Sequence, residues 1–223
     1  MQGTGAMKPP PSEAVLREGL VGAMRAMDAK GLNHGTAGNA SVRLGDGMLV
    51  TPTGVPAARL TPDQIVRMEA GGATAPDALK PSSEWRIHLG ILRRRGDIDA
   101  IVHCHSRYAT ILACAHRPIP PLHYMVAVGG GASIPLAPYA TFGSETLAEA
   151  VVDTLDGINA ALMANHGQIA VARGIEHALA IAEEVEEQAA LYWGTLAIGG
   201  PRLLDDGEMD NILSEFSRYG QKR

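Results

Sequence analysis

Three histidines in two widely separated segments could together bind a metal ion. His103 and His105 follow an apolar run with one residue between them, and His166 stands far downstream in the string Asn-His-Gly. Residues i and i+2 of a strand point to the same face of a sheet, so both imidazoles could reach one ion. Three nitrogen ligands leave a fourth position open, as in catalytic rather than structural zinc sites. For the first pair alone, the alternative is two histidines packed in a core.

Three short segments could bind a phosphate group through backbone N–H groups. They are residues 38–41 (GNAS), residues 53–54 (TG) and the pair Ser82 and Ser83 at the start of a predicted helix. Gly-rich turns and helix N-termini bind anions without positively charged side chains. Each segment alone is explained by a turn or a helix cap. Together, beside a candidate metal site, they indicate a small phosphorylated substrate.

Glu84 directly follows the serine pair. A carboxylate in the first turn of a helix ordinarily compensates the helix dipole. Beside a metal it could instead act as a general acid or base, because burial raises the pKa of a carboxyl group toward neutrality. The sequence leaves both interpretations open.

Helical and strand-like patterns alternate around these residues. Helices are predicted over 12–30, from 81 to a stop at Gly96, and over 107–114, 144–155 and 175–198, with strands over 42–44, 48–50, 100–102, 161–164 and 169–171. Strand 100–102 would deliver His103 and His105, and the turn after strand 161–164 would carry His166. Ser106 is expected to cap helix 107–114, and the glutamates within 183–187 to face solvent. This order predicts an α/β fold in three layers.

Composition limits the class of protein. The 223 residues are 46% hydrophobic, enough for one core. We therefore predict a disordered extension over 1–12 and a single domain over 13–223. The formal net charge of -5 argues against a nucleic-acid surface, and no apolar run approaches the roughly 20 residues that span a bilayer. The two cysteines form no disulfide framework. We expect a cytoplasmic protein with neither nucleic acid nor membrane as a partner.

Seven strings carry a resemblance to a known family. They are GNAS at 38–41, TPTG at 51–54, SSEW at 82–85, HCH at 103–105, HYM at 123–125, APYATFG at 137–143 and NHG at 165–167. In this order they are typical of the class II aldolase/adducin family, which the chain resembles from about residue 13 to residue 220. The resemblance implies a three-layer α/β fold with a central, largely antiparallel sheet flanked by helices. It also implies a homotetramer with active sites between subunits.

The activity implied by this resemblance is that of a zinc-dependent aldolase. Such an enzyme reversibly cleaves a ketose 1-phosphate to dihydroxyacetone phosphate and an aldehyde. The substrate would be of the L-fuculose 1-phosphate, 5-methylthioribulose 1-phosphate or 5-deoxyribulose 1-phosphate type. One divalent metal per subunit is expected; Zn2+ is the assignment, although three imidazoles also suit cobalt, nickel or iron.

The resemblance also implies a role for individual residues. The metal ligands would be His103, His105 and His166. The phosphate-binding positions would be Asn39, Thr53, Gly54, Ser82 and Ser83. Glu84 would transfer a proton at C3, and Tyr124 would reach the active site of a neighbouring subunit and protonate the aldehyde-side oxygen. Phe142 and Tyr219 would shape the aldehyde end and close over it.

Two other functions are compatible with parts of this pattern. A pentulose-phosphate 4-epimerase, a dehydratase or a decarboxylase could use the same metal site. In the epimerases the residue after the serine pair tends to be Asp, so Glu84 favours an aldolase. A non-catalytic, adducin-like interaction module need not keep the metal ligands, whereas this chain has all three histidines and Glu84.

Overall fold

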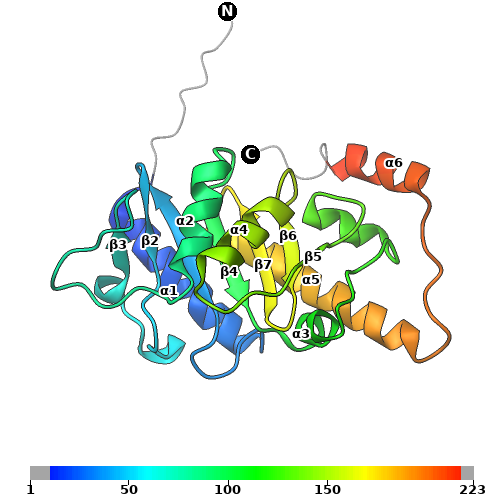
Figure 1. Cartoon of the computed structure of the whole chain (residues 1–223), viewed down its shortest axis with the longest axis horizontal. Coiled ribbons are helices and arrows are strands. Elements are labelled where there is room, and N and C mark those ends of the chain that lie inside the picture. Colours follow the sequence, from blue (N-terminus) through cyan, green and yellow to red (C-terminus); the bar gives the residue numbers. More distant parts are fainter. Residues whose placement is uncertain (1–10, 217–223) are drawn as a thin grey trace, which may run out of the picture.

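A seven-stranded sheet forms the centre of the molecule (Figure 1). The computed structural model describes residues 11–216. The sheet has the order β3-β2-β1-β4-β7-β6-β5, and every pairing is antiparallel except that of β5 with β6. In chain order the strands are β1 (Asn39–Leu44), β2 (Gly47–Val50), β3 (Val66–Met68), β4 (Ala100–Cys104), β5 (Leu136–Ala137), β6 (Ala160–Met163) and β7 (Gly167–Ala172). The expected largely antiparallel sheet is confirmed.

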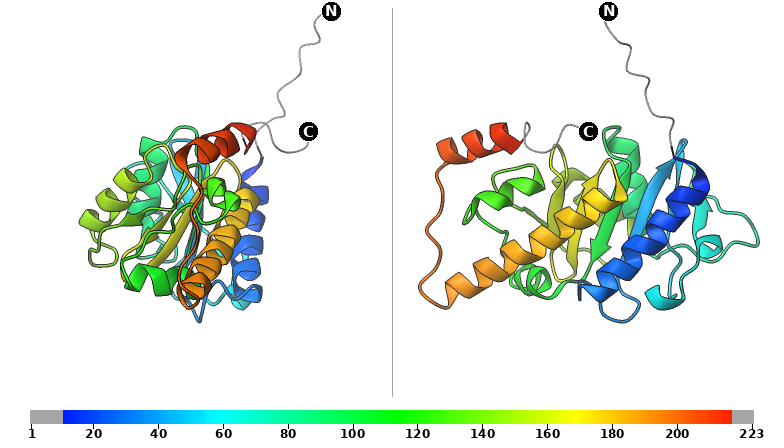
Figure 2. Two further views of the ribbon diagram at one scale, coloured as in Figure 1. Left: turned by 90° about the vertical axis from the view of Figure 1, so that its right-hand side faces the viewer. Right: turned by 180° about the vertical axis from the view of Figure 1, so that it is seen from behind.

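Helices cover both faces of the sheet, which gives the three expected layers (Figure 2). Helices α1 (Glu13–Ala29), α3 (Arg107–Cys114) and α5 (Ile175–Leu196) contribute to one hydrophobic cluster, and α2 (Trp85–Arg94) and α4 (Glu145–Thr154) to the other. Consecutive residues of β4 alternate between the clusters: Val102 belongs to the first and Ile101 to the second. This is the two-residue period of a strand that is buried on both faces.

Most predicted elements are confirmed within a few residues. Ser12 and Ser144 cap α1 and α4, because their side chains accept hydrogen bonds from the N–H groups of Val15 and Leu147. β4 continues to Cys104, so His103 lies inside the strand. β3 and β5 were not predicted, since strands of three and two residues are too short to show a periodic pattern. Helix α6 (Asp206–Phe216) was also missed; it lies away from the sheet (Figure 1).

The N-terminus of α3 differs from its prediction. Ser106 occupies the N-cap position, but its hydroxyl accepts a hydrogen bond from Gln168 Nε2 at 2.7 Å and caps nothing. The Glu186 carboxylate of α5 instead accepts hydrogen bonds from the N–H groups of Tyr108 and Ala109, each at 2.9 Å. The prediction of a Ser106 cap is therefore wrong. Glu186 does not simply face solvent, because it satisfies free N–H groups at a helix start.

The chain ends limit what the structure tests. Residues 1–10 and 217–223 lie outside the described part, so the expected disorder of 1–12 and the extent of a single domain over 13–223 stay predictions. Between residues 11 and 216, no helix is both long enough and apolar enough to cross a membrane.

Candidate metal and substrate site

Three histidines and one glutamate meet at one end of β4. Their ligand atoms all lie within 4.8 Å of one another. His103 belongs to β4 and His105 follows it, whereas His166 lies in the tight turn between β6 and β7. Glu84 comes from the helical layer formed by α2 and α4, where it occupies the N-cap position of α2. The structure thus brings the predicted distant histidine to the predicted pair.

The local sequence around His166 explains how it reaches this position. β7 pairs with β4, so the turn before β7 lies beside the end of β4. Asn165 has a φ of 53°, a left-handed conformation that asparagine tolerates better than most residues. Gly167 follows His166, and a Cβ on Gly167 would stand 2.9 Å from the His105 ring. Asn and Gly thus allow the turn that places His166 next to His105.

The three imidazole rings surround a common point. Each pair of ring centroids is 4.9 Å apart, with interplanar angles of 72°, 81° and 84°. His103 Nδ1 lies 2.8 Å from the carbonyl oxygen of Gln168, which can only accept, so Nδ1 carries the proton. With a metal bound, His103 Nε2 would carry no proton and would direct its lone pair at the cluster, where it lies 3.0 Å from His105 Nε2. Convergent imidazole lone pairs beside a carboxylate suit a divalent metal ion.

Glu84 supplies the anionic group of the cluster. Its Oε2 accepts a hydrogen bond from Asn39 Nδ2 at 3.0 Å and lies 3.1 Å from His103 Nε2. Its Oε1 is buried 3.0 Å from His166 Nε2, yet no donor among the described residues makes a hydrogen bond to it. An unsatisfied buried oxygen beside a histidine cluster fits a site that holds a cation.

The protonation states differ from the expectation for Glu84. Burial does act to raise its pKa, but the adjacent His103 and His166 outweigh burial and hold the pKa well below its usual range. The expected shift toward neutrality is wrong in direction, because the carboxylate lies beside two imidazoles rather than in an apolar pocket. Burial, with the charges of His103 and His166, lowers the pKa of His105 to about 4, which keeps this ring neutral.

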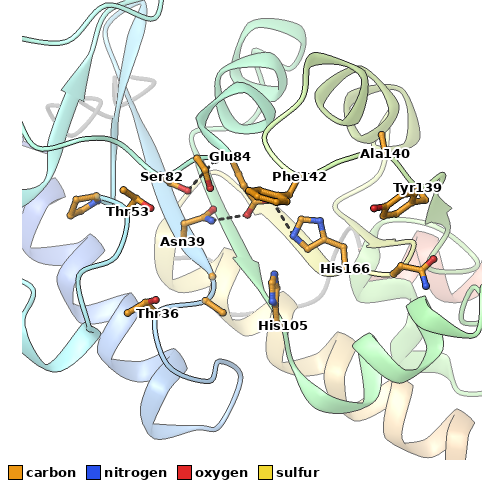
Figure 3. Close-up of a pocket in the computed structure, with 15 residues that line it drawn as sticks. Thr36, Asn39, Thr53, Ser82, Glu84, His105, Tyr139, Ala140, Phe142 and His166 are labelled. Atoms are coloured by element: carbon orange, nitrogen blue, oxygen red, sulfur yellow. Dashed lines mark hydrogen bonds and ion pairs between the residues drawn. The ribbon is translucent and has the colours of Figure 1, made fainter.

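A pocket of ≈ 400 Å³ opens beside the cluster (Figure 3). Its lining comes from the loops around β1, β2 and α2 on one side and from the segments after β5 and β6 on the other. The lining residues are Thr36, Ala37, Gly38, Asn39, Pro52, Thr53, Ser82, Ser83, Glu84, His105, Tyr139, Ala140, Phe142, Asn165 and His166. They include the predicted substrate-binding residues Asn39, Thr53, Ser82, Ser83 and Phe142. Gly54 does not line the pocket; its φ of 71° shapes the turn after Thr53.

The three candidate phosphate segments are joined to one another. Thr51 is the link: its Oγ1 accepts a hydrogen bond from the N–H of Ala40 at 3.1 Å, and its carbonyl oxygen accepts one from Ser82 at 2.9 Å. The N–H of Thr53 donates to the carbonyl oxygen of Lys80 at 3.0 Å. Segments far apart in the sequence therefore form one polar wall of the pocket.

Tyr124, one of the two predicted catalytic tyrosines, does not line this pocket. Tyr124 begins a short 3-10 helix, η3 (Tyr124–Gly129), and is 50% exposed. Its ring centroid lies 6.4 Å from that of Phe216 of α6. Tyr219 lies outside the described residues. A contribution of either tyrosine to catalysis stays a prediction.

Sequence reasoning missed several residues of the site. Asn33 is buried, and its Oδ1 accepts a hydrogen bond from the N–H of His105 at 3.2 Å, which fixes the backbone beside the cluster. Thr36 and Tyr139 line the pocket. A signal existed for both: Thr36 belongs to the Gly-rich stretch before β1, and Tyr139 to the APYATFG string.

Comparison with known proteins identifies the family. Residues 18–193 match the Class II Aldolase and Adducin N-terminal domain. The chain belongs to this family. It is 47% identical over 211 residues to the 5-methylthioribulose-1-phosphate/5-deoxyribulose-1-phosphate aldolase of Rhodospirillum rubrum, covering 95% of each chain. It is 47% identical over 195 residues to the L-fuculose phosphate aldolase of Escherichia coli (strain K12), covering 87% of this chain and 90% of that protein.

Solved structures agree with this family assignment. A structure of an L-fuculose 1-phosphate aldolase superposes with a TM-score of 0.88 at 37% identity, covering 91% of this chain and 96% of that one. The class II aldolase fold expected from the sequence is thereby confirmed. The chain is an enzyme of the metal-dependent aldolase type, and its histidine–glutamate cluster is suited to a divalent metal.

Proposed function

We propose that this chain is a zinc-dependent aldolase that reversibly cleaves a ketose 1-phosphate into dihydroxyacetone phosphate and an aldehyde. One observation carries the proposal: the cluster of Glu84 and three histidines opens into a pocket whose other wall is built from polar, Gly- and Ser-rich loops. The aldolases named above act on sugar phosphates of the fuculose, methylthioribulose and deoxyribulose types. We infer that the substrate here belongs to the same group.

The metal end of the site would use the histidine cluster. His103, His105 and His166 would hold one Zn2+ per subunit through neutral imidazole nitrogens. When bound, the cation would supply Lewis-acid stabilisation of the negative charge that develops during cleavage. Glu84 would neutralise part of the cation's charge before substrate enters, since its buried Oε1 already faces this cluster.

The phosphate end would use the polar wall. Asn39, Thr53, Gly54, Ser82 and Ser83 would bind the phosphate. The backbone N–H groups of Gly54 and Ser83 form no hydrogen bond with another described residue, which leaves them free for a ligand. Uncharged donors of this kind bind phosphate without a cluster of lysines. Phe142, 69% exposed at the pocket mouth, would contact the aldehyde part, and Tyr219 would close over it.

Two proton transfers accompany the cleavage of the C3–C4 bond. The bonding electron pair stays with C3, and the C4 hydroxyl group loses its proton as the aldehyde forms. Tyr124 of a neighbouring subunit would relay that proton to water, because its hydroxyl oxygen can accept it as the hydroxyl group releases its own proton. Glu84 would deliver a proton to C3. Since Glu84 begins ionised, it must first take up a proton from water, so the proton released at the C4 oxygen and the proton gained at C3 balance.

We also infer an assembly in which neighbouring subunits complete each site. Tyr124 is half-exposed and lies outside the pocket of its own chain, which supports a site completed by a second copy. The proposed assembly is a homotetramer. We propose a cytoplasmic location and neither nucleic acid nor membrane as a partner.

Release of dihydroxyacetone phosphate tests the proposed function. A coupled NADH assay would compare L-fuculose 1-phosphate with 5-methylthioribulose 1-phosphate as substrates. We expect release from at least one of them, lost with a chelator and restored by Zn2+; the faster substrate would identify the aldehyde partner. Substrate conversion without a three-carbon product would contradict the aldolase and favour the epimerase, dehydratase or decarboxylase alternative.

A further inference from the structure

A fourth histidine lies completely buried behind the candidate site. His88 of α2 is 0% exposed and stands four residues after Glu84, on the same face of the helix. Its two ring nitrogens contact two side chains of β1. Nδ1 lies 2.7 Å from Ser41 Oγ, and Nε2 lies 2.6 Å from Asn39 Oδ1. Asn39 and Ser41 are two residues apart on one strand and therefore face α2 together.

These contacts continue to the metal cluster. Asn39 Nδ2 donates to Glu84 Oε2 at 3.0 Å, and the same oxygen lies 3.1 Å from His103 Nε2. Ser41, His88, Asn39 and Glu84 thus form one buried hydrogen-bonded chain, and all four residues have less than a tenth of their surface exposed. His88 itself has no contact with the pocket, because Asn39 and Glu84 lie between it and the lining surface.

The chemistry of the groups sets the direction of every hydrogen bond in the chain. Asn39 directs its amide nitrogen at Glu84 Oε2, so its amide oxygen, which can only accept, faces His88. His88 Nε2 must therefore carry the proton, and Nδ1 must accept from the Ser41 hydroxyl. Burial, together with the charge of His103, lowers the pKa of His88 to about 3, so the ring is neutral and holds a single proton.

Rotation of the Asn39 amide by half a turn would break this order. Its oxygen would then face the Glu84 carboxylate, and its nitrogen would face the protonated Nε2 of His88. Both contacts would be repulsive, and Glu84 Oε2 would lose a donor in a buried site. A buried acceptor without a donor is strongly unfavourable. The proton on His88 Nε2 and the Glu84 carboxylate together exclude the rotated amide.

We propose that His88 is a positioning residue that fixes the amide orientation of Asn39 and, through Asn39, directs the Glu84 carboxylate at the histidine cluster. The inference rests on the role proposed for Glu84. It assigns a function to a side chain that contacts neither the metal ligands nor the pocket.

Two substitutions of His88 separate positioning from space filling. In His88→Gln the side-chain amide nitrogen occupies the place of Nε2 and can still donate to Asn39. In His88→Asn the shorter amide reaches only the place of Nδ1 and leaves Asn39 Oδ1 without its donor. Both variants keep a polar side chain beside Ser41. Ile87→Val, a packing change on the same helix, controls for a loss that is merely structural.

The protein should be studied as the full chain loaded with Co2+, whose visible absorption reports the arrangement of the metal ligands. We expect the Gln variant to retain the parental spectrum and a kcat close to that of the parent. The Asn variant should show an altered spectrum and a kcat lowered by about 10- to 100-fold at unchanged metal content, as for other residues that orient ligands. Ile87→Val should change neither.

Equal spectra and equal kcat values for the Asn and Gln variants would overturn the inference. If the Asn variant does not fold, Ser41→Ala provides the second test, because it removes the hydrogen bond that holds Nδ1 and so lets the His88 ring move away from Asn39. A spectrum of Ser41→Ala identical to that of the parent would also overturn it. Absence of dihydroxyacetone phosphate from the parent itself would contradict the proposed function, while the Co2+ spectra would still test the role of His88.

Discussion

A Cβ at Gly167 would stand 2.5 Å from the carbonyl oxygen of Cys104. β7 therefore approaches the end of β4 more closely than any side chain would permit. The approach matters because His166 precedes Gly167, and His105 follows Cys104. The contact between two backbones sets the spacing of two imidazoles.

Gly167→Ala should consequently disturb the spacing of the imidazoles in the histidine cluster. The clash is with backbone, which cannot rotate away, so we expect a destabilisation of about 1–3 kcal/mol and fewer bound metal ions per chain. Thermal unfolding and metal analysis by mass spectrometry measure the two effects. Gly194→Ala in α5 is the matched control: a Cβ there meets nothing within 4 Å, and stability should stay the same or rise. Equal metal content in both variants would contradict this account.

Glu84→Gln should bind metal but lose turnover. The amide keeps the size of the carboxylate and the acceptor toward Asn39, but it cannot exchange a proton with C3. A lost general acid or base typically lowers kcat by about 10²- to 10⁴-fold. Steady-state kinetics and metal analysis check the prediction, with Glu18→Gln on the exposed face of α1 as the control. Retained turnover in Glu84→Gln would remove this residue from its proposed role.

Removal of the metal should lower stability as well as activity. Ligands that bind only the folded state stabilise it, by about 4 kcal/mol at a free concentration 1,000 times the dissociation constant. Dialysis against a chelator should therefore lower Tm, and added Zn2+ should restore it. His105→Ala should abolish the response to Zn2+, whereas the exposed His177→Ala should retain it. A chelator-insensitive Tm would argue against a metal in the cluster.

The two cysteines should react very differently with thiol reagents. Cys104 is fully buried within the core cluster below α3 and α5, whereas Cys114 at the end of α3 is exposed. Titration with a chromogenic disulfide should modify one thiol per chain in the native protein and both after unfolding. Cys114→Ser should reduce the native value to zero. Rapid modification of both thiols in the native protein would show that the core opens readily.

The ion pair after α2 predicts a dependence of stability on pH. Arg95 donates hydrogen bonds to Asp97 and lowers the pKa of that carboxyl from its ordinary 3.8 to about 2. A lowered pKa stabilises the folded state above the unfolded value, and this contribution disappears as pH falls through the folded value. Asp97→Asn should thus lower stability at pH 7 by about 0.2–1 kcal/mol, since Asp97 is exposed.

The difference between Asp97→Asn and the parent should shrink below pH 4 and vanish near pH 2. Urea unfolding at several pH values measures it. Asp46→Asn, in the exposed turn before β2, serves as the control. A difference for Asp97→Asn that stays constant down to pH 2 would contradict the assigned ion pair.

Local sequence patterns predicted several helices, part of the metal cluster and the family. Helical patterns predicted α1 and α4, and the pair His103 and His105 on a strand predicted half of the metal cluster. The ordered strings predicted the family, which residues 18–193 confirm. These features depend on residues close together in the chain, so their spacing alone carries the information.

The tertiary structure decided what depends on contacts between distant segments. Asn39 lies directly opposite His103 in the pairing of β1 with β4, and α2 places Glu84 and His88 against that pair. No periodicity in the sequence predicts which polar groups meet there. The low pKa of Glu84 and the single direction of the hydrogen bonds from Ser41 exist only after the sheet and α2 have packed together. Donors and charges that surround a buried group are supplied by neighbours in space, and the fold selects those neighbours.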